Sequence, residues 1–357
     1  MARFRLLLAA LLILPVLGCA NLSYYAQAVN GQLELYAQTR PIADVIDDPT
    51  TDAALKIKLS AVLGVREFAS RELGLPENDS YRFYADVKRP YVLWNVFATP
   101  EFSLKPTQWC FMITGCVAYR GYFSQQNAES FAQALRAAGD DAYVGGVSAY
   151  STLGWFQDPM LNTIVTRPLP EIAGLVFHEL AHQRLYVTGD TAFSESFAMT
   201  VEMEGVRRWL QVHAQPDEYE KYRERSARRE EFVALVLKHR DRLEILYDSG
   251  ASVAEKRSGK AAIFNDLRAD YQALKARWNG YTGYDGWFAQ NLNNAHLVSL
   301  GMYHRHVPAF QALLARHQGN LVAFYRAVQD LGQLPETERT AALSTYLPTA
   351  TLERGQF

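Results

Sequence analysis

Apolar residues recur at three- to four-residue spacing through most of the chain, and this pattern predicts a largely helical protein. Helices of this kind are expected over residues 20–45, 53–73, 126–138, 192–213, 217–247 and 253–278. Between them, runs of aromatic and β-branched residues predict short strands over residues 81–87, 91–98, 108–112, 117–123 and 141–150. The expected fold is therefore α+β, with a small N-terminal β-sheet region followed by a mostly helical C-terminal lobe.

The start of the chain has the form of an export signal. Arg3 and Arg5 precede an apolar run over residues 6–17, which is too short for an ordinary transmembrane span. Residues 16–19, Val-Leu-Gly-Cys, resemble a bacterial lipobox, in which the cysteine is lipidated and becomes the N-terminus. We expect removal of residues 1–18 and a lipid anchor at Cys19, facing the periplasm. The absence of Asp after this cysteine favours the outer membrane. An uncleaved anchor or an ordinary secretory signal is the alternative.

Composition and charge exclude few classes of protein, but they disfavour nucleic-acid binding. The 357 residues contain 36 Lys and Arg against 38 Asp and Glu, a formal net charge of −2. No global positive field therefore favours a nucleic-acid partner. The chain from residue 19 to residue 357 is long enough for a large core. We expect one unit made of two packed lobes, residues 19–165 and 166–357.

Two cysteines besides Cys19 occur in the chain, Cys110 and Cys116. An even pair in an exported protein predicts a disulfide, which here would close a small loop. No histidine lies near enough in sequence to complete a metal site with them. Two reduced, buried thiols remain the alternative.

The candidate chemistry centres on His178-Glu179-Leu-Ala-His182, an HExxH pattern. Pro168 and Pro170 suit the first turn of a helix, which is expected to continue to about residues 188–190. On that helix the two histidines project from one face and can both reach one zinc ion. Glu179 lies beside this face and is placed to accept a proton from water on the metal. An accidental pair of surface histidines is the alternative.

A third ligand is expected from the next helix. Zinc hydrolases commonly combine two histidines with one carboxylate. Gly189 lies almost midway between His182 and Glu195, so antiparallel helices on either side would bring these two residues to one level. Glu202 lies about two turns further along the same face and suits a partner that orients a ligand. We predict one zinc ion per chain, held by His178, His182 and Glu195. The alternative is that Glu195 is a solvated acid, or one favoured by the nearby helix N-terminus, and that Glu202 or another carboxylate is the ligand instead.

These motifs also resemble a known family. The HExxH pattern followed by residues 193–198, Phe-Ser-Glu-Ser-Phe-Ala, resembles the gluzincin arrangement, whose second motif is usually N-E-x-F-A. Residues 119–123 and 149–155 extend the likeness to bacterial lipoproteins termed predicted aminopeptidases, along almost the whole chain. Ser194 replaces the usual Asn, and the spacing to Glu195 is shorter than in thermolysin-like enzymes. The resemblance implies a zincin-like fold, with the sheet packed on the HExxH helix, and aminopeptidase activity.

Candidate substrate groups lie on both sides of the HExxH segment. Zincins place a strand just before the metal helix that pairs with the substrate, and Gly145 and Gly146 in the expected strand would allow close approach. A bend in a core strand explains these glycines equally well. Gluzincins take an oxyanion-stabilising Tyr or His from beyond the metal helix. Tyr303 and His304 are candidates for this role, and Tyr303 is the predicted catalytic group. Asn294 is a candidate for binding substrate backbone. Structural roles are the alternative for both.

The sequence as a whole predicts a membrane-tethered zinc metallopeptidase that acts on peptide substrates, with aminopeptidase activity implied by the resemblance. The alternatives are a zinc endopeptidase and a non-catalytic envelope lipoprotein that binds a metal or a partner. The presence of Glu179 argues against the non-catalytic alternative, because a structural metal site needs no base.

Overall fold

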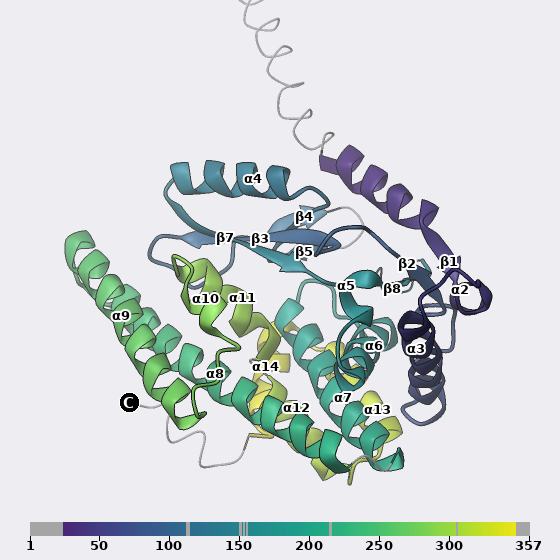
Figure 1. The fold of residues 1–357 in the computed structure, drawn as a ribbon. Helices are drawn as coiled ribbons and strands as arrows, with labels where there is room; N and C mark the ends of the chain where they lie inside the picture. Colours follow the sequence, from purple (N-terminus) through teal and green to yellow (C-terminus); the bar gives the residue numbers. More distant parts are fainter. Residues whose placement is uncertain are drawn as a thin grey trace, which may run out of the picture.

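The computed structural model describes residues 24–347 except 112–114, 150, 151, 153, 155, 214, 215 and 305, and it leaves out the side chains of residues 216 and 301–304. Helices dominate this part of the chain, and short strands gather in its N-terminal half (Figure 1). The expected α+β class is confirmed.

The strands form three small sheets within the described residues. The first joins β1 (Thr39–Pro41), β2 (Phe83–Ala85) and β8 (Met160–Leu161). The second has the order β6-β3-β7, from β6 (Arg120–Tyr122), β3 (Leu93–Pro100) and β7 (Asp140–Val147). The third is a hairpin of β4 (Trp109–Phe111) and β5 (Gly115–Val117). The expected strand over residues 117–123 is thus two strands, because β5 pairs with β4 whereas β6 pairs with β3.

The second sheet is covered on both faces (Figure 1). Helix α4 (Gln125–Ala137) packs on one face through a cluster that includes Trp94 and Ala128. Helix α11 (Asn294–His304) contacts the other face, where Phe97 and Ala295 pack together. Seven of the eight residues of β3 are buried, since this central strand has neighbours on both faces.

The main core surrounds two helices, α6 (Leu169–Arg184) and α7 (Thr191–Val212). Helix α6 ends earlier than expected, because Leu185 already has an extended conformation with φ −155° and ψ 126°. Asp190 caps the N-terminus of α7, because its side chain accepts a hydrogen bond of 3.0 Å from the backbone N–H of Phe193. Tight packing joins the two helices: a Cβ added at Gly205 would lie 2.6 Å from the ring of Phe177.

Other helices enclose this pair. On the N-terminal side are a helix over residues 24–37, α2 (Ile42–Asp47), α3 (Ala53–Arg71) and α5 (Asn162–Val165). The long helices α8 (Pro216–Asp248) and α9 (Val253–Arg277) lie side by side (Figure 1). After them come α10 (Asp285–Phe288), α12 (Val307–Arg316), α13 (Leu321–Gly332) and α14 (Glu336–Ser344).

One core cluster crosses the two expected lobes. It contains Leu59 of α3, Phe177 of α6 and Phe324 of α13. A second cluster packs α8 and α9 against the chain that follows them, through residues such as Leu243 and Leu267. The lobe boundaries at residues 165 and 166 stay a prediction.

Candidate metal centre

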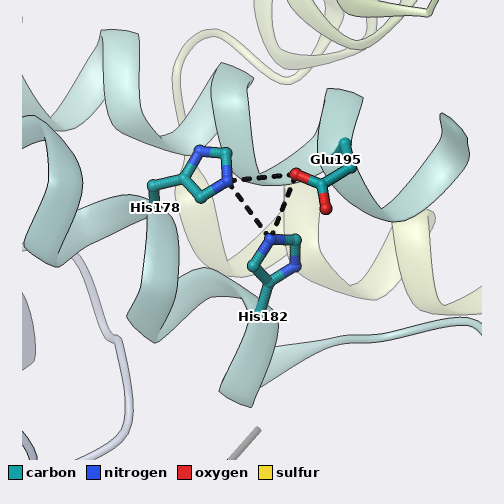
Figure 2. Close-up of side chains that lie close together, drawn as sticks. All are labelled: His178, His182 and Glu195. Carbon is teal, nitrogen blue, oxygen red and sulfur yellow. Dashed lines mark hydrogen bonds and ion pairs between the residues drawn. The ribbon is translucent and has the colours of Figure 1, made fainter. Parts of the chain in front are cut away.

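Three side chains that the sequence singles out converge at the contact between α6 and α7. The Nε2 atoms of His178 and His182 lie 3.2 Å apart, and Glu195 Oε2 lies 3.2 Å from the first and 3.4 Å from the second. All three residues are buried. Figure 2 shows the two imidazoles and the carboxylate pointing toward one another. The group could hold a metal ion, as the sequence predicts.

The spacing and chemistry of these donors fit a zinc ion. Ligand atoms about 2.0–2.1 Å from a tetrahedral zinc ion stand roughly 3.3 Å from each other, close to the observed separations. His178 Nδ1 lies 3.2 Å from Glu202 Oε2, so a neutral His178 donates its N–H to this carboxylate and turns the Nε2 lone pair inward. Glu202 therefore lies where the sequence predicts a partner that orients a ligand.

The electrostatic surroundings favour a positive charge at this point. Burial raises the pKa of Glu195, but His182 and His178 outweigh it and lower the value to about 2. Burial lowers the pKa of His178, yet hydrogen bonds to Glu195 and Glu202 raise it well above its usual value. The site thus stabilises a cation, whether a proton on the histidine or a metal ion among the ligands.

Glu179 stands beside this group. Its carboxylate forms no hydrogen bond or ion pair within the described part of the chain, and the residue is partly buried. It lines a cavity of about 360 Å³, which His178 and Glu202 also line. Burial raises the pKa of Glu179, although the two histidines of the motif oppose this shift. An acceptor with a raised pKa, open to a cavity beside a metal centre, suits a general base.

An arginine completes the chain of contacts behind His178. Arg229 of α8 lies 3.4 Å from Glu202 Oε1, so the two oxygens of Glu202 face different partners. Gly174 of α6 makes room for this arrangement, because a Cβ there would lie 3.2 Å from Glu202 Cγ. The carboxylate that orients the histidine is itself fixed by a third helix.

Two tyrosines near the centre were not singled out as site residues from the sequence. Burial raises the pKa of Tyr119, and the charges of Glu195 and Glu179 raise it further. Burial and Glu195 also raise the pKa of Tyr186, whose ring centroid lies 5.9 Å from that of His182. Neither hydroxyl forms a hydrogen bond among the described residues. Tyr119 belongs to the segment over residues 119–123 that carries the family resemblance, and this was the one indication in the sequence that Tyr119 could belong to the site.

The expected substrate strand lies at the edge of its sheet. Within the described residues β7 pairs with β3 only, with Gly145 opposite Asn95 and Gly146 opposite Trp94, and Gly146 is exposed. A Cβ at Gly146 would lie 2.5 Å from the ring of Tyr91, so local packing also requires this glycine. A substrate role for the two glycines stays a prediction.

Among the described residues, the side chain of Asn294 contacts none of the three candidate ligands. It is fully buried, and its amide donates to the backbone oxygens of Glu101 and Ser103. Its side-chain oxygen accepts a hydrogen bond from Tyr247. These hydrogen bonds join α11 to the loop after β3, which is a structural role. They give no support to the predicted contact of Asn294 with substrate.

The remaining candidates from the sequence are the three cysteines and Tyr303. Cys110 and Cys116 are joined by a disulfide across the β4–β5 hairpin. Cys19 and the side chain of Tyr303 lie outside the described residues. No helix among the described residues is both long and apolar enough to cross a membrane.

The site combines two histidines and a glutamate on packed helices with a second glutamate that faces a cavity. A protein with such a site could hold a metal ion next to a base. Comparison with protein families then places the chain. It belongs to the family described as "Putative aminopeptidase", which matches residues 23–343 and indicates a peptidase. The resemblance to aminopeptidases is confirmed to this extent. Neither a curated protein nor a solved structure matches the chain.

Proposed function

We propose that this protein is a zinc-dependent aminopeptidase of gluzincin type, with a zincin-like arrangement of its sheet and HExxH helix. The observation that carries the proposal is the convergence of His178 Nε2, His182 Nε2 and Glu195 Oε2 within 3.2–3.4 Å, beside Glu179, whose carboxylate has no hydrogen-bond partner among the described residues. Family membership supports hydrolysis of peptides from the N-terminus.

When bound, a zinc ion would supply Lewis-acid activation of water and of the scissile carbonyl. Glu179 would accept the proton that the attacking water gives up and deliver it to the leaving amine. Glu202 would hold His178 in the tautomer that presents Nε2 to the metal.

A hydrogen-bond donor for the developing oxyanion is also needed, and we assign it to Tyr119. Its hydroxyl remains protonated at neutral pH, because burial and the charges of Glu195 and Glu179 raise its pKa. A neutral phenol whose pKa responds to the charges of Glu195 and Glu179 is a candidate to donate to the carbonyl oxygen as negative charge develops there. Tyr303, the candidate from the sequence, remains the alternative donor.

The proposal includes a lipid anchor at Cys19, which would hold the enzyme at the periplasmic face of a bacterial membrane, with the outer membrane favoured. The support is the sequence of residues 3–19, with its two arginines, short apolar run and Val-Leu-Gly-Cys ending. Mass spectrometry of protein extracted from membranes would detect an acylated Cys19 at the mature N-terminus. An intact N-terminus or cleavage elsewhere would contradict the anchor.

Metal content and hydrolysis, measured on the same purified sample, test the proposed activity. Peptides with free and with acetylated N-termini are compared, with and without a chelator. We expect close to one zinc per chain and chelator-sensitive cleavage of free peptides alone. Cleavage of both peptides would identify an endopeptidase, and bound zinc without any cleavage would favour a binding protein.

A further inference from the structure

The N-terminal helix, over residues 24–37, turns an apolar stripe to solvent. Tyr25, Val29 and Leu33 recur every fourth residue, so their side chains share one face of the helix. The exposed fractions of these residues are 39 %, 56 % and 61 %. Figure 1 shows the helix at the edge of the molecule. Large apolar side chains that are exposed together, rather than singly, mark a surface that contacts something apolar.

The rest of the exposed face of this helix carries little charge. Glu34 is the one charged residue in the sequence from residue 24 to residue 37. The other exposed residues of the helix are Ala26, Asn30 and Ala37. A helix whose outer face meets only water usually carries charged and polar residues there. Since the helix has no lysine or arginine, its contact does not depend on attraction to an acidic partner.

The opposite face fixes the helix to the body of the protein. Gln27 donates from Nε2 to the backbone oxygen of Gly121 at 3.4 Å, and its Oε1 accepts a hydrogen bond of 3.0 Å from the backbone N–H of Phe123. Gly31 packs directly against the ring of Phe123, where a Cβ would overlap the ring. Leu35 is buried in the main core. The helix cannot turn its apolar stripe inward without losing these contacts.

Aromatic rings extend the stripe at both of its ends. At the first end, the ring centroids of Tyr24 and Tyr25 lie 5.3 Å and 6.4 Å from that of Phe111 in β4. At the other end, the ring centroid of Phe156 lies 5.7 Å from that of Tyr36, and Phe156 is 56 % exposed. Tyrosine combines an apolar ring with a polar hydroxyl, and it is enriched where a bilayer meets water.

The chain before the helix indicates which apolar partner covers the stripe. Cys19, the proposed site of lipid attachment, precedes Tyr25 by six residues. An extended chain spans at most about 3.3–3.6 Å per residue, so Tyr25 stays within roughly 20 Å of the lipidated residue. Because the acyl chains would lie in the bilayer, the stripe would be held at the membrane surface. The membrane is therefore the apolar partner that is always within reach.

We propose that Tyr25, Val29 and Leu33 form a membrane-contact surface, through which the N-terminal helix lies along the bilayer interface. The inference rests on the lipid anchor of the proposed function. A helix in this position places its apolar face about 5–10 Å into the boundary between headgroups and acyl chains. Lipid on one residue fixes where the chain is held, whereas contact along a helix also fixes how the protein is oriented. The metal centre then keeps one orientation relative to the membrane.

Spin labelling tests this contact on the mature protein, purified from membranes and reconstituted in phosphatidylcholine vesicles. A nitroxide is attached to a new cysteine in Val29→Cys or Leu33→Cys. Acylation of Cys19 and the Cys110–Cys116 disulfide would leave no other free thiol. Collisions of the nitroxide with oxygen, which concentrates in lipid, are compared with collisions with a water-soluble nickel chelate.

The matched control is Ile245→Cys, because Ile245 is an apolar residue that is 67 % exposed on α8, and α8 packs on α7, α9 and α11. We expect the ratio of oxygen collisions to chelate collisions to be severalfold higher at positions 29 and 33 than at position 245. The label at position 245 should collide mainly with the chelate. Mass spectrometry of the same samples reports whether Cys19 is acylated.

The other outcomes separate the surface from the anchor. Labels at positions 29 and 33 that meet the chelate as often as the control does, on a protein with acylated Cys19, would overturn the surface and leave the anchor. Labels shielded from both reagents would show that protein covers the stripe, either residues 1–18 or a second copy, and would also overturn the lipid contact. Labels that enter lipid on a protein without acylated Cys19 would overturn the anchor and leave the surface standing.

Discussion

Glu202 Oε2 lies 3.2 Å from Nδ1 of His178, while Nε2 of the same imidazole faces Glu195 at 3.2 Å. Two carboxylates therefore contact opposite nitrogens of one ring. Only the contact with Glu195 lies on the side where the two histidines meet, so Glu195 belongs to the group that could hold a metal ion, while Glu202 contacts the outer nitrogen of His178.

This difference predicts unequal effects on metal binding. Replacing Glu202 with Gln should weaken zinc binding about 10- to 100-fold, as is usual for partners that orient a ligand. Glu195→Gln should weaken it further, because a ligand itself is lost. Zinc affinity measured by competition with a chromophoric chelator checks the order. The reverse order would exchange the roles of the two glutamates.

Glu179→Gln should separate chemistry from metal binding. Loss of the base is expected to lower kcat by a factor of about 10² to 10⁴, with zinc content still near one per chain. Paired measurements of peptide hydrolysis and metal content check this. Full activity in the variant would remove Glu179 from the mechanism, whereas loss of zinc would make it a ligand.

Tyr119→Phe removes only the hydroxyl that we assign to the oxyanion. We expect kcat to fall about 10²- to 10³-fold, with little change in KM or zinc content. Tyr186→Phe is the control. The ring of Tyr186 lies by that of His182, but the pKa of Tyr186 is raised by the charge of Glu195 and not by that of Glu179. A larger loss in the control would transfer the role to Tyr186.

Gly205→Ala should destabilise the fold without touching the ligands. The new Cβ would lie 2.6 Å from the ring of Phe177 and 2.8 Å from Leu73 Cδ1, so α6 and α7 must move apart, at about 1–3 kcal/mol. Gly64→Ala in α3 is the control, since its Cβ would meet nothing within 4 Å. Denaturant unfolding should show a lower midpoint for the first variant and an unchanged or higher one for the second.

His296 should make stability depend on pH in the acid range. Burial, followed by the charge of Arg136, lowers its pKa to about 4. The unfolded chain binds the proton below about pH 6.5, so the stabilising contribution is complete above that pH. It is lost as pH falls toward 4, by up to about 3 kcal/mol.

The comparison that isolates this effect is His296→Gln against the unchanged protein, across pH 4 to 7. Glutamine can still accept the hydrogen bond that His296 receives from the backbone N–H of Asn293. The difference in unfolding free energy between the two proteins should change over this range. A constant difference would show that His296 titrates alike in both states.

The convergence of His178, His182 and Glu195 could be predicted because it depends on local geometry. His178 and His182 are one helical turn apart, and Glu195 follows Gly189 at nearly the distance at which His182 precedes it. The position of Glu202 followed from its sharing a helix face with Glu195. Helix positions were also predictable, since α3, α4, α7 and α9 bury regular apolar faces.

The place of Tyr119 and the wall of the cavity beside Glu179 could not be predicted, because tertiary packing assembles both. Tyr119 comes from the segment between β5 and β6, and the wall residue Arg225 from a helix dense in charged residues. Nothing in the local pattern separates Tyr119 from the other tyrosines among the 20 in the chain, or Arg225 from its charged neighbours. Strand β8 was missed because it has two residues and is defined only by its pairing with β2.

The shared carboxylate of Glu202 links α8 to the centre of the site. Its Oε1 faces Arg229 of α8, and its Oε2 faces His178. A change at Arg229 would therefore alter the charge on Glu202 and, through it, the basicity of His178 Nε2. A residue that touches none of the three candidate ligands can in this way tune how strongly they would hold a cation.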